Sequence, residues 1–267
     1  MGTSSSNKGT GSDTPLVPTF LDDDENVSEG GNDATPLTQT EPQRFRSART
    51  NFSQFASSGG SNHQALRRAV RDYVRKGTGG ARNAVRRMAP SLNAAHRTLS
   101  LLRSLQRDGV QETLLRINLQ NLSGKSIQDT FTVLTDLICQ DGGTIDDAIA
   151  RDAWLETVAK LEDIGIDSLD VLTNLQIQEM FLSFVANSIV ARLYQEIGVN
   201  GFKQVNHLQD IERFDEQFRN YIERGVRDSF SGDLSTLNMT DEEIKNVVDS
   251  AYYEAWSFFM LIGEGER

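Results

Sequence analysis

The stretch NLQIQEMFLSFVANSIVARLYQE, residues 174–196, decides the fold class of this chain. Its apolar residues recur at intervals of three and four, which is the spacing of an α-helix. They are Leu175, Ile177, Met180, Phe181, Phe184, Val185, Ile189, Val190 and Leu193. A helix this long and this apolar must be buried among other elements. The stretch therefore predicts the core helix of a helical protein.

The same spacing recurs on both sides of this helix. Helical segments are predicted over 61–76, 81–87, 91–107, 110–119, 127–139, 144–161, 206–230 and 240–262. Thr144 followed by Asp147 and Thr240 followed by Glu243 have the pattern of capping boxes at helix starts. No segment has the two-residue period of a strand. We expect an all-α single domain of seven to nine helices, spanning residues 61–267.

Residues 1–60 form a different region by composition. They are rich in Ser, Thr, Gly, Asn and Asp, and they contain four of the five prolines. Such a segment buries too little apolar surface to offset the entropy of ordering it, so we predict a long disordered N-terminal tail. Within it Pro15, Leu16, Val17 and Pro18 begin a small apolar island, which either docks on a partner or contacts nothing.

Arg and Phe residues alternate between 44 and 55, at the end of the predicted tail. This pattern suits phosphate contacts combined with aromatic stacking. It also suits a segment that packs on its own body, which is the alternative that we favour.

Charge is distributed unevenly along the chain. Residues 41–107 contain fourteen basic and two acidic residues, a net charge of +12, although the whole chain carries −11. This positive middle could contact nucleic acid, or it could lie against the acidic C-terminal part of the fold or against a partner.

A glycine-rich turn lies inside this positive segment. Gly79 and Gly80 precede a predicted helix, so free backbone amides there could bind a phosphate. The alternative is a helix end followed by a tight turn, where glycine is also expected. The candidate anion-binding or nucleic-acid-binding residues are Arg67, Arg68, Arg71, Arg75, Gly79, Gly80, Arg82, Arg86 and Arg87.

Motifs for catalysis and metal binding are missing from the sequence. The three histidines are far apart, and Cys139, the only cysteine, lies in an apolar helical pattern that indicates a core position. Gly124-Lys125-Ser126 resembles the end of a phosphate loop, but Leu119 stands where the loop needs glycine, so Ser126 is better interpreted as a helix N-cap. We expect a protein that is not an enzyme and that uses neither a metal nor another cofactor.

Ser168 lies in the sequence Asp167-Ser168-Leu169, which resembles the phosphopantetheine site of acyl carrier proteins. The long apolar helix that follows does not fit a carrier protein, so we interpret Asp167 or Ser168 as a helix N-cap.

Sequence signals for membranes and secretion are also missing. No apolar run reaches the ~20 residues that cross a bilayer, and the chain does not start with a signal-peptide pattern. Together with the single cysteine, this predicts a cytoplasmic protein without membrane contact.

Several whole phrases resemble the B components of Qat anti-phage defence systems. They include the opening Met1–Ser6, the segment Thr14–Pro18, Leu66–Val70, Tyr73–Gly77 with the Gly79-Gly80 turn, and Ile138–Arg151. The resemblance implies an operon that also encodes an ATPase, a QueC-like enzyme and a TatD-like nuclease. The QueC-like enzyme would be the main partner, with the ATPase and the nuclease as further candidates.

The resemblance also implies a role for the N-terminus. QueC-like enzymes of related systems attach a deazaguanine base to an N-terminal glycine, and the acceptor here would be Gly2 after removal of Met1. Thr3 and Ser4 would be recognition context, together with Pro15, Leu16, Val17 and Pro18. A glycine amine has a pKa of about 7.7–8.0, so a useful fraction is nucleophilic at neutral pH.

We expect a non-enzymatic defence component that binds the QueC-like enzyme and presents Gly2. The alternative is a nucleic-acid-binding adaptor that uses the basic region 44–107.

Overall fold

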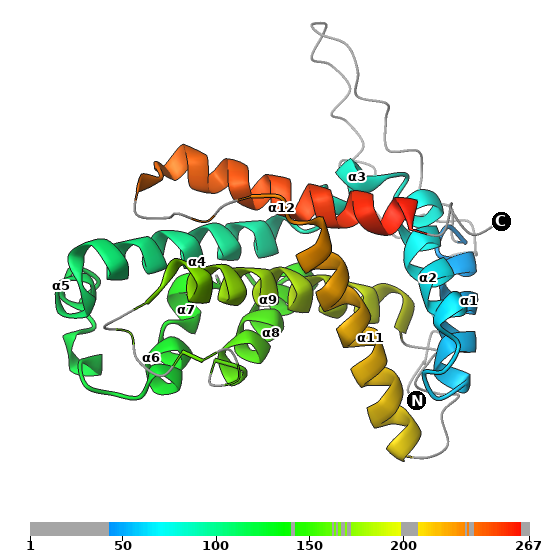
Figure 1. Cartoon of the computed structure of the whole chain (residues 1–267), viewed down its shortest axis with the longest axis horizontal. Helices are drawn as coiled ribbons and strands as arrows, with labels where there is room; N and C mark the ends of the chain where they lie inside the picture. Colours follow the sequence, from blue (N-terminus) through cyan, green and yellow to red (C-terminus); the bar gives the residue numbers. More distant parts are fainter. Residues whose placement is uncertain are drawn as a thin grey trace, which may run out of the picture. The chain divides into compact units, whose positions relative to one another are not determined.

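The computed structural model describes residues 43–139, 142–161, 163, 165–166, 169, 172–198, 208–232, 234 and 238–262. All regular structure in these ranges is helical, and none of it is strand (Figure 1). The predicted all-α class is therefore confirmed. Eleven α-helices lie in the described ranges, more than expected. One reason is that the predicted helix 127–139 is divided at Leu134.

The described helices have the following bounds. In chain order they are α1 (Arg46–Ser57), α2 (His63–Asp72), α3 (Ala81–Arg86), α4 (Ala89–Asp108), α5 (Val110–Arg116), α6 (Ile127–Val133), α7 (Thr135–Ile138), α8 (Ile145–Ala159), α9 (Asn174–Leu193), α11 (Leu208–Ser229) and α12 (Asp241–Leu261). Two π-helical turns, η2 (Tyr73–Gly77) and η4 (Tyr194–Gly198), and a 3-10 turn, η3 (Gln120–Leu122), complete them.

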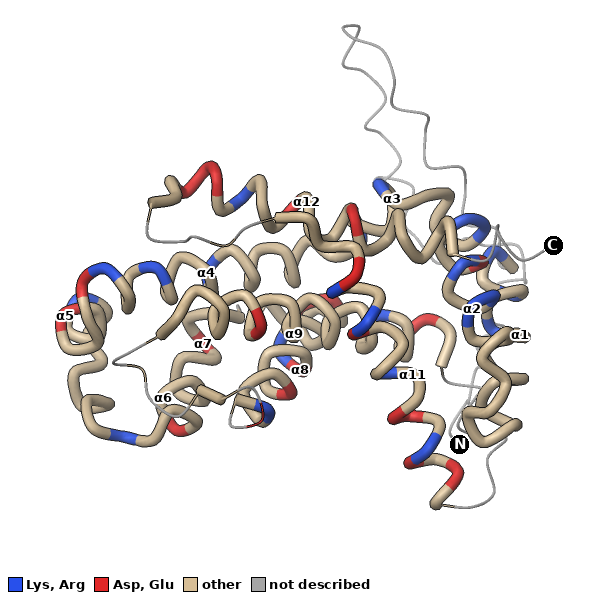
Figure 2. Tube along the Cα trace, viewed as in Figure 1, with Lys and Arg blue, Asp and Glu red and all other residues tan. Residues whose placement is uncertain are grey.

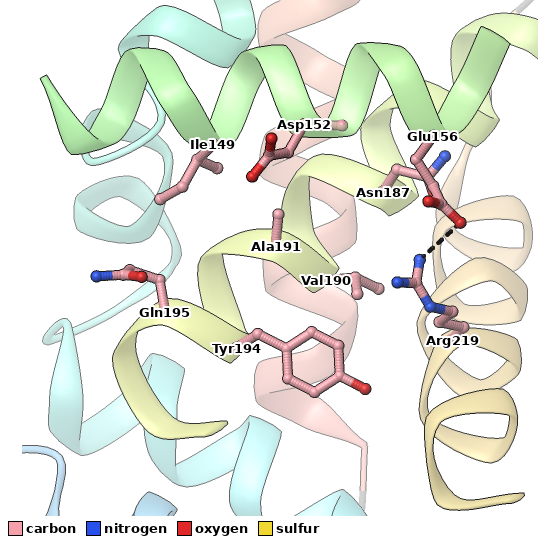
Figure 3. Close-up of a pocket in the computed structure, with 10 residues that line it drawn as sticks. Ile149, Asp152, Glu156, Asn187, Val190, Ala191, Tyr194, Gln195 and Arg219 are labelled. Atoms are coloured by element: carbon pink, nitrogen blue, oxygen red, sulfur yellow. Dashed lines mark hydrogen bonds and ion pairs between the residues drawn. The ribbon is translucent and has the colours of Figure 1, made fainter. Parts of the chain in front are cut away.

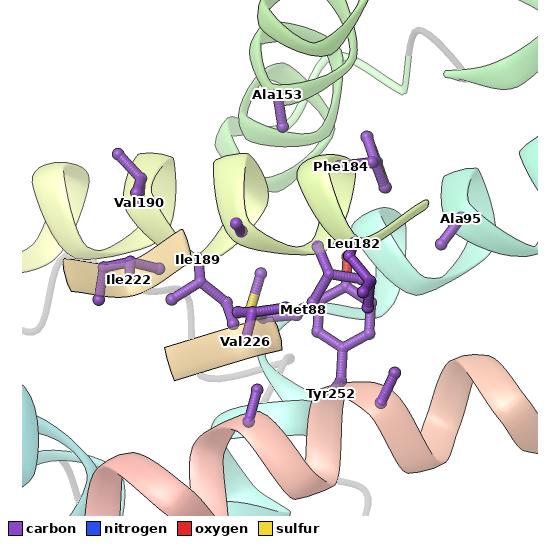
Figure 4. Packing of buried hydrophobic residues seen from close by; sticks show 14 of the residues in the cluster. Met88, Ala95, Ala153, Leu182, Phe184, Ile189, Val190, Ile222, Val226 and Tyr252 are labelled. Carbon is purple, nitrogen blue, oxygen red and sulfur yellow. The ribbon is translucent and has the colours of Figure 1, made fainter. Parts of the chain in front are cut away.

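Helix α9 is the core helix that its sequence predicts. Every residue from Met180 to Val190 is buried, because α4, α8 and α11 all pack against this helix. Helix α12 packs in turn on α11 and α4. In Figure 4 the side chains of Met88, Leu182, Ile189 and Tyr252 converge between these helices.

Polar side chains set where the helices begin. The capping boxes predicted at Thr144 and Thr240 are both present, and the Ser126 side chain accepts a hydrogen bond from the Asp129 amide at 3.1 Å. Helix α9 begins differently from the prediction, since its N-cap is Thr173 in a capping box with Gln176. Asp167 and Ser168, the predicted caps, lie outside the described residues.

Helix α1 moves the start of the body away from the predicted boundary at residue 61. Phe52 and Phe55 of this helix are fully buried and pack against Phe214 of α11. Burial of these aromatic rings offsets the entropy of ordering the segment. The segment 44–55 thus packs on its own body, which is the alternative that its sequence pattern favours. Helix α1 therefore packs as part of the helical body.

The length and apolarity of the described helices bear on membrane insertion. None of them is long and apolar enough to cross a bilayer.

Candidate interaction site at the start of the body

Part of the predicted site cannot be located in the structure. Gly2, Thr3, Ser4, Pro15, Leu16, Val17 and Pro18 all precede residue 43 and lie outside the described residues. The site that can be built is the place where the chain enters the helical body.

Phe45 fixes this entry point. Its ring stacks on the ring of Tyr73 with centroids 5.3 Å apart, and 8% of the residue is exposed. The contact requires glycine at position 77, because a Cβ built there would lie 2.4 Å from Cδ1 of Phe45. The π-helical turn η2 supplies both Tyr73 and Gly77, so this turn forms the seat of Phe45.

Three arginines surround the Phe45 ring. The guanidinium carbons of Arg44, Arg49 and Arg87 lie 4.7, 5.8 and 5.8 Å from its centroid. Each cation over an aromatic face contributes about 0.5–1 kcal/mol at an exposed site. Arg49 also donates a hydrogen bond to the Glu196 carbonyl at 3.0 Å, which ties α1 to η4.

Buried ion pairs lie beneath this entry point. Only 4% of the Arg192 side chain is exposed, and its guanidinium lies 2.7 Å from Asp146 and 3.4 Å from Glu196. Arg87 forms a second ion pair with Glu196, so the two arginines share one buried carboxylate. We call these four side chains the ion cluster. Its geometry holds α8, the end of α9 and the α3–α4 corner together.

The ion cluster changes the interpretation of Arg87. The sequence predicts that this residue binds an external anion, but its guanidinium is directed to Glu196 and is only partly exposed. A cation buried beside a carboxylate gains more from that partner than from an ion in solvent. Arg87 therefore belongs to the fold at this point and not to an outer basic surface.

The remaining predicted arginines lie on α2, η2 and α3. Arg67, Arg68, Arg75, Arg82 and Arg86 are exposed. Figure 2 marks the basic positions along α2 in blue. Among the described residues, Arg68, Arg82 and Arg86 form no ion pair, which leaves their charge available to a ligand.

Asp72 partly neutralises this basic segment. It is buried, lies 2.9 Å from Lys76 and 3.6 Å from Arg71, and accepts a hydrogen bond from Ser47. Burial alone would raise the pKa of this carboxyl, but its bonds to Ser47 and Lys76 outweigh burial and lower that pKa. Asp72 therefore stays ionised at neutral pH and anchors α1 to α2.

The Gly80 amide of the Gly79-Gly80 turn is used within the fold. The Thr78 amide donates to the Tyr73 carbonyl at 2.9 Å, and the Gly80 amide donates to the Val74 carbonyl at 2.8 Å. Gly79 and Gly80 have φ angles of 76° and 122°, a region that only glycine adopts readily. These bonds favour the alternative of a helix end with a tight turn over a phosphate site.

A pocket of about 320 Å³ lies between α8, α9 and α11 (Figure 3). Tyr194 donates a hydrogen bond to Asp215, which pairs with Arg219 at 3.0 Å, and Arg219 also pairs with Glu156 at 3.2 Å. Burial, followed by the charge of Asp215, raises the pKa of Tyr194 well above its usual range. The hydroxyl thus remains a donor at physiological pH.

Cys139 lies in the described part of the chain. Burial raises the pKa of Cys139 to about 12, so its thiol stays protonated, as expected for a core cysteine. No group of three His, Cys, Asp or Glu side chains that could hold a metal occurs among the described residues.

Sequence reasoning missed the ion cluster, although a signal for it exists. Arg192 and Glu196 stand four residues apart in an otherwise apolar helix. Charges at that spacing in a buried helix indicate a pair that is desolvated together. The pocket in Figure 3 has no comparable signal, because its residues come from three helices distant in sequence.

Comparison with known proteins identifies one matching family. No curated protein and no solved structure matches the chain. A family model described as Qat anti-phage system associated protein QatB matches residues 79–259, from the glycine turn through most of α12. This match covers more than half of the chain, including α9 and both arginines of the ion cluster. The chain therefore belongs to the family of Qat anti-phage system associated proteins.

Proposed function

We propose that this Qat component is not an enzyme but a partner and substrate of the QueC-like enzyme of its system. In this proposal the helical body binds that enzyme, and Gly2, exposed by removal of Met1, is conjugated to a deazaguanine-type base. Family membership supports a defence role, and the resemblance of the opening Met1–Ser6 supports the modification.

The observation that carries the proposal is the entry point at Phe45. The ring is held between Tyr73 and three arginines, so the chain that precedes it starts from a defined place on the body. About forty residues separate Gly2 from this place, a contour of up to roughly 140 Å. An enzyme bound to the body lies well within that distance.

The chemistry that fits an N-terminal amine is acyl transfer. An amine attacks the carbonyl carbon of a base carboxylate that the partner has activated with a nucleotide. A C–N bond forms, the nucleotide phosphate leaves with the electron pair of the C–O bond, and the amine loses one proton. The product is an amide, and the protein gains the mass of the carboxylic acid less one water.

The test is the mass of the N-terminal peptide after co-expression with the operon neighbours. Wild-type protein should lack Met1 and carry the added mass on Gly2. Gly2→Trp should retain Met1, carry no added mass and lose phage protection, whereas Gly2→Ala keeps a free small amine as the matched control. A clean Gly2 in an actively protecting system would overturn the proposal.

A second candidate function is a nucleic-acid adaptor. The observation that favours it is the exposure of Arg68, Arg82 and Arg86, none of which has an ion pair among the described residues. Binding should weaken steeply with salt, and the triple change to Gln should lower the logarithmic salt slope by about 2.7.

The matched control for this adaptor function removes three other exposed cations. Lys125, Arg224 and Lys245 lie on other elements, and changing them to Gln removes the same net charge. Equal salt slopes in the two triple variants, or no measurable DNA or RNA binding at low salt, would eliminate the adaptor function.

A further inference from the structure

A second pocket, of about 510 Å³, lies between α4, α5 and α7. Leu101 and Ile138 line it and are buried, whereas Leu137, which also lines it, is 44% exposed. A largely apolar pocket of this size is typical of sites that hold small organic molecules. It lies apart from the entry point at Phe45 and shares no residue with the ion cluster.

Two hydroxyls that line this pocket are buried and have no hydrogen-bond partner among the described residues. They are Oγ of Ser100 and Oγ1 of Thr113, and Thr113 as a whole is 2% exposed. A buried polar atom without a partner is unfavourable, because it has lost its hydrogen bonds to water. Neighbouring atoms cover both oxygens, so each hydroxyl would reach a molecule inside the pocket after a change of its χ1 rotamer.

The pocket also has one uncompensated positive charge. Two of its charged lining residues are neutralised, since Arg116 lies 2.9 Å from Asp108 and Asp136 lies 2.8 Å from Arg151. Arg97 has only a hydrogen bond to the Ile138 carbonyl at 3.4 Å, and it forms no ion pair within the described ranges.

Helix geometry places the charge, one hydroxyl and the apolar floor together. Arg97, Ser100 and Leu101 are related by three and four positions along α4, so their side chains share one face. Thr113 of α5 lines the same pocket. A cation, two hydroxyl donors and an apolar floor are the complement of an anionic head on an apolar body.

From these observations we infer that this pocket binds a small amphipathic anion, an apolar body that carries one carboxylate, sulfonate or phosphate group. Arg97, Ser100 and Thr113 bind the head, and Leu101, Leu137 and Ile138 contact the body. This site is independent of the conjugation of Gly2, so either can fail without the other.

The experiment uses the full chain and two fluorescent probes of nearly the same apolar body. 8-Anilinonaphthalene-1-sulfonate carries an anionic head, and N-phenyl-1-naphthylamine lacks it. Wild-type protein should bind the sulfonate at one saturable site. Arg97→Gln should weaken the sulfonate about tenfold and leave the neutral probe unchanged, because it removes a charged donor that only the sulfonate uses.

Matched variants separate the pocket from general surface binding. Leu137→Glu should abolish binding of both probes, whereas Leu175→Glu, at a position 68% exposed on α9, should change neither. Arg68→Gln on α2 removes the same charge as Arg97→Gln and should leave the sulfonate affinity unchanged.

Thr113→Val removes one hydroxyl donor and nearly keeps the shape of the side chain. Circular dichroism shows which variants fold, and this variant keeps the test decisive if another one does not. It should weaken the sulfonate several-fold and spare the neutral probe. Sulfonate binding that is equal in wild type, Arg97→Gln and Thr113→Val would overturn the proposal and leave these hydroxyls as sites for water only.

Discussion

The two π-helical turns of the body share a sequence pattern and a neighbour. Both η2 and η4 begin with tyrosine and end with glycine, and both contact α1. Tyr73 of η2 lies fully inside the core, between Phe45 and Trp256. Tyr194 of η4 is only partly buried, and its hydroxyl bonds Asp215 at the edge of a pocket.

The difference shows what the extra residue of a π-turn can do. Such turns are rare and frequently occur at functional sites. In η2 the turn opens a space at Gly77 that Phe45 fills, so it fixes where the chain enters the body. In η4 the turn directs the Glu196 carboxylate to Arg87 and the Tyr194 ring to the pocket, so one turn serves two sites.

Removal of α1, the shared neighbour of both turns, should have the largest effect. Deletion of residues 1–42 should leave the free energy of unfolding unchanged, because it retains Phe45 and every buried side chain of α1. Deletion of residues 1–60 should leave no cooperative unfolding transition, because Phe52 and Phe55 are removed from the core. Urea denaturation followed by circular dichroism measures both, and a stable 61–267 fragment would restore the predicted boundary.

Disruption of the ion cluster should have the next largest effect. Arg192→Met leaves Asp146 without its cation and Glu196 with Arg87 alone, and this should lower the free energy of unfolding by about 3 kcal/mol, the low end for breaking a buried pair. The control is Arg227→Met, whose side chain is 39% exposed and pairs with Glu179 and Glu223. This exposed pair should contribute less than about 1 kcal/mol. Equal losses would show that the cluster does not hold α8, the end of α9 and the α3–α4 corner together.

Sequence reasoning recovered what depends on local pattern. The helical class, the core position of α9 and the caps at Thr144 and Thr240 all follow from spacing and side-chain chemistry within a few residues. The tail boundary was misplaced, because the composition of residues 43–60 is polar overall. Average composition does not reveal that two phenylalanines of α1 lie in the core and bury one face of this helix.

The site depends on contacts between distant segments and could be predicted only in part. Arg67 to Arg87 were predicted as one basic group, but the fold turns Arg87 to Glu196, more than a hundred residues away. Likewise, the sequence does not show that Asp136 pairs with Arg151 and Arg116 with Asp108. These pairs leave Arg97 as the charged lining residue of its pocket without an ion pair among the described residues. Periodicity places a residue on a helix face but does not tell which charge it meets.

Gly77 and Gly198, the glycines that end the two π-helical turns, give a smaller expected effect on stability. A Cβ at Gly77 would overlap the Phe45 ring, which three arginines and Tyr73 hold in place. Gly77→Ala should therefore lower the free energy of unfolding by about 1–3 kcal/mol. A Cβ at Gly198 would lie 2.7 Å from Cδ1 of Tyr194, a smaller overlap than at Gly77, so Gly198→Ala should cost less than Gly77→Ala. Similar costs, measured by urea denaturation, would mean that the two seats are equally rigid.

The two tyrosines give the smallest effect, and it appears only at alkaline pH. Burial, together with Glu196 for Tyr73 and Asp215 for Tyr194, raises both pKa values above that of an unfolded tyrosine. Above pH 10 the unfolded chain loses these protons while the folded chain keeps them, so stability falls as pH rises. Each tyrosine should contribute about 1.4 kcal/mol per pH unit to that fall. Tyr73→Phe and Tyr194→Phe should each remove one such contribution between pH 10 and 11.

At pH 7 only Tyr194→Phe removes the hydroxyl that donates a hydrogen bond to Asp215, so this variant should cost more stability there than Tyr73→Phe. An alkaline slope that neither variant changes would mean that both rings reach solvent in the folded protein.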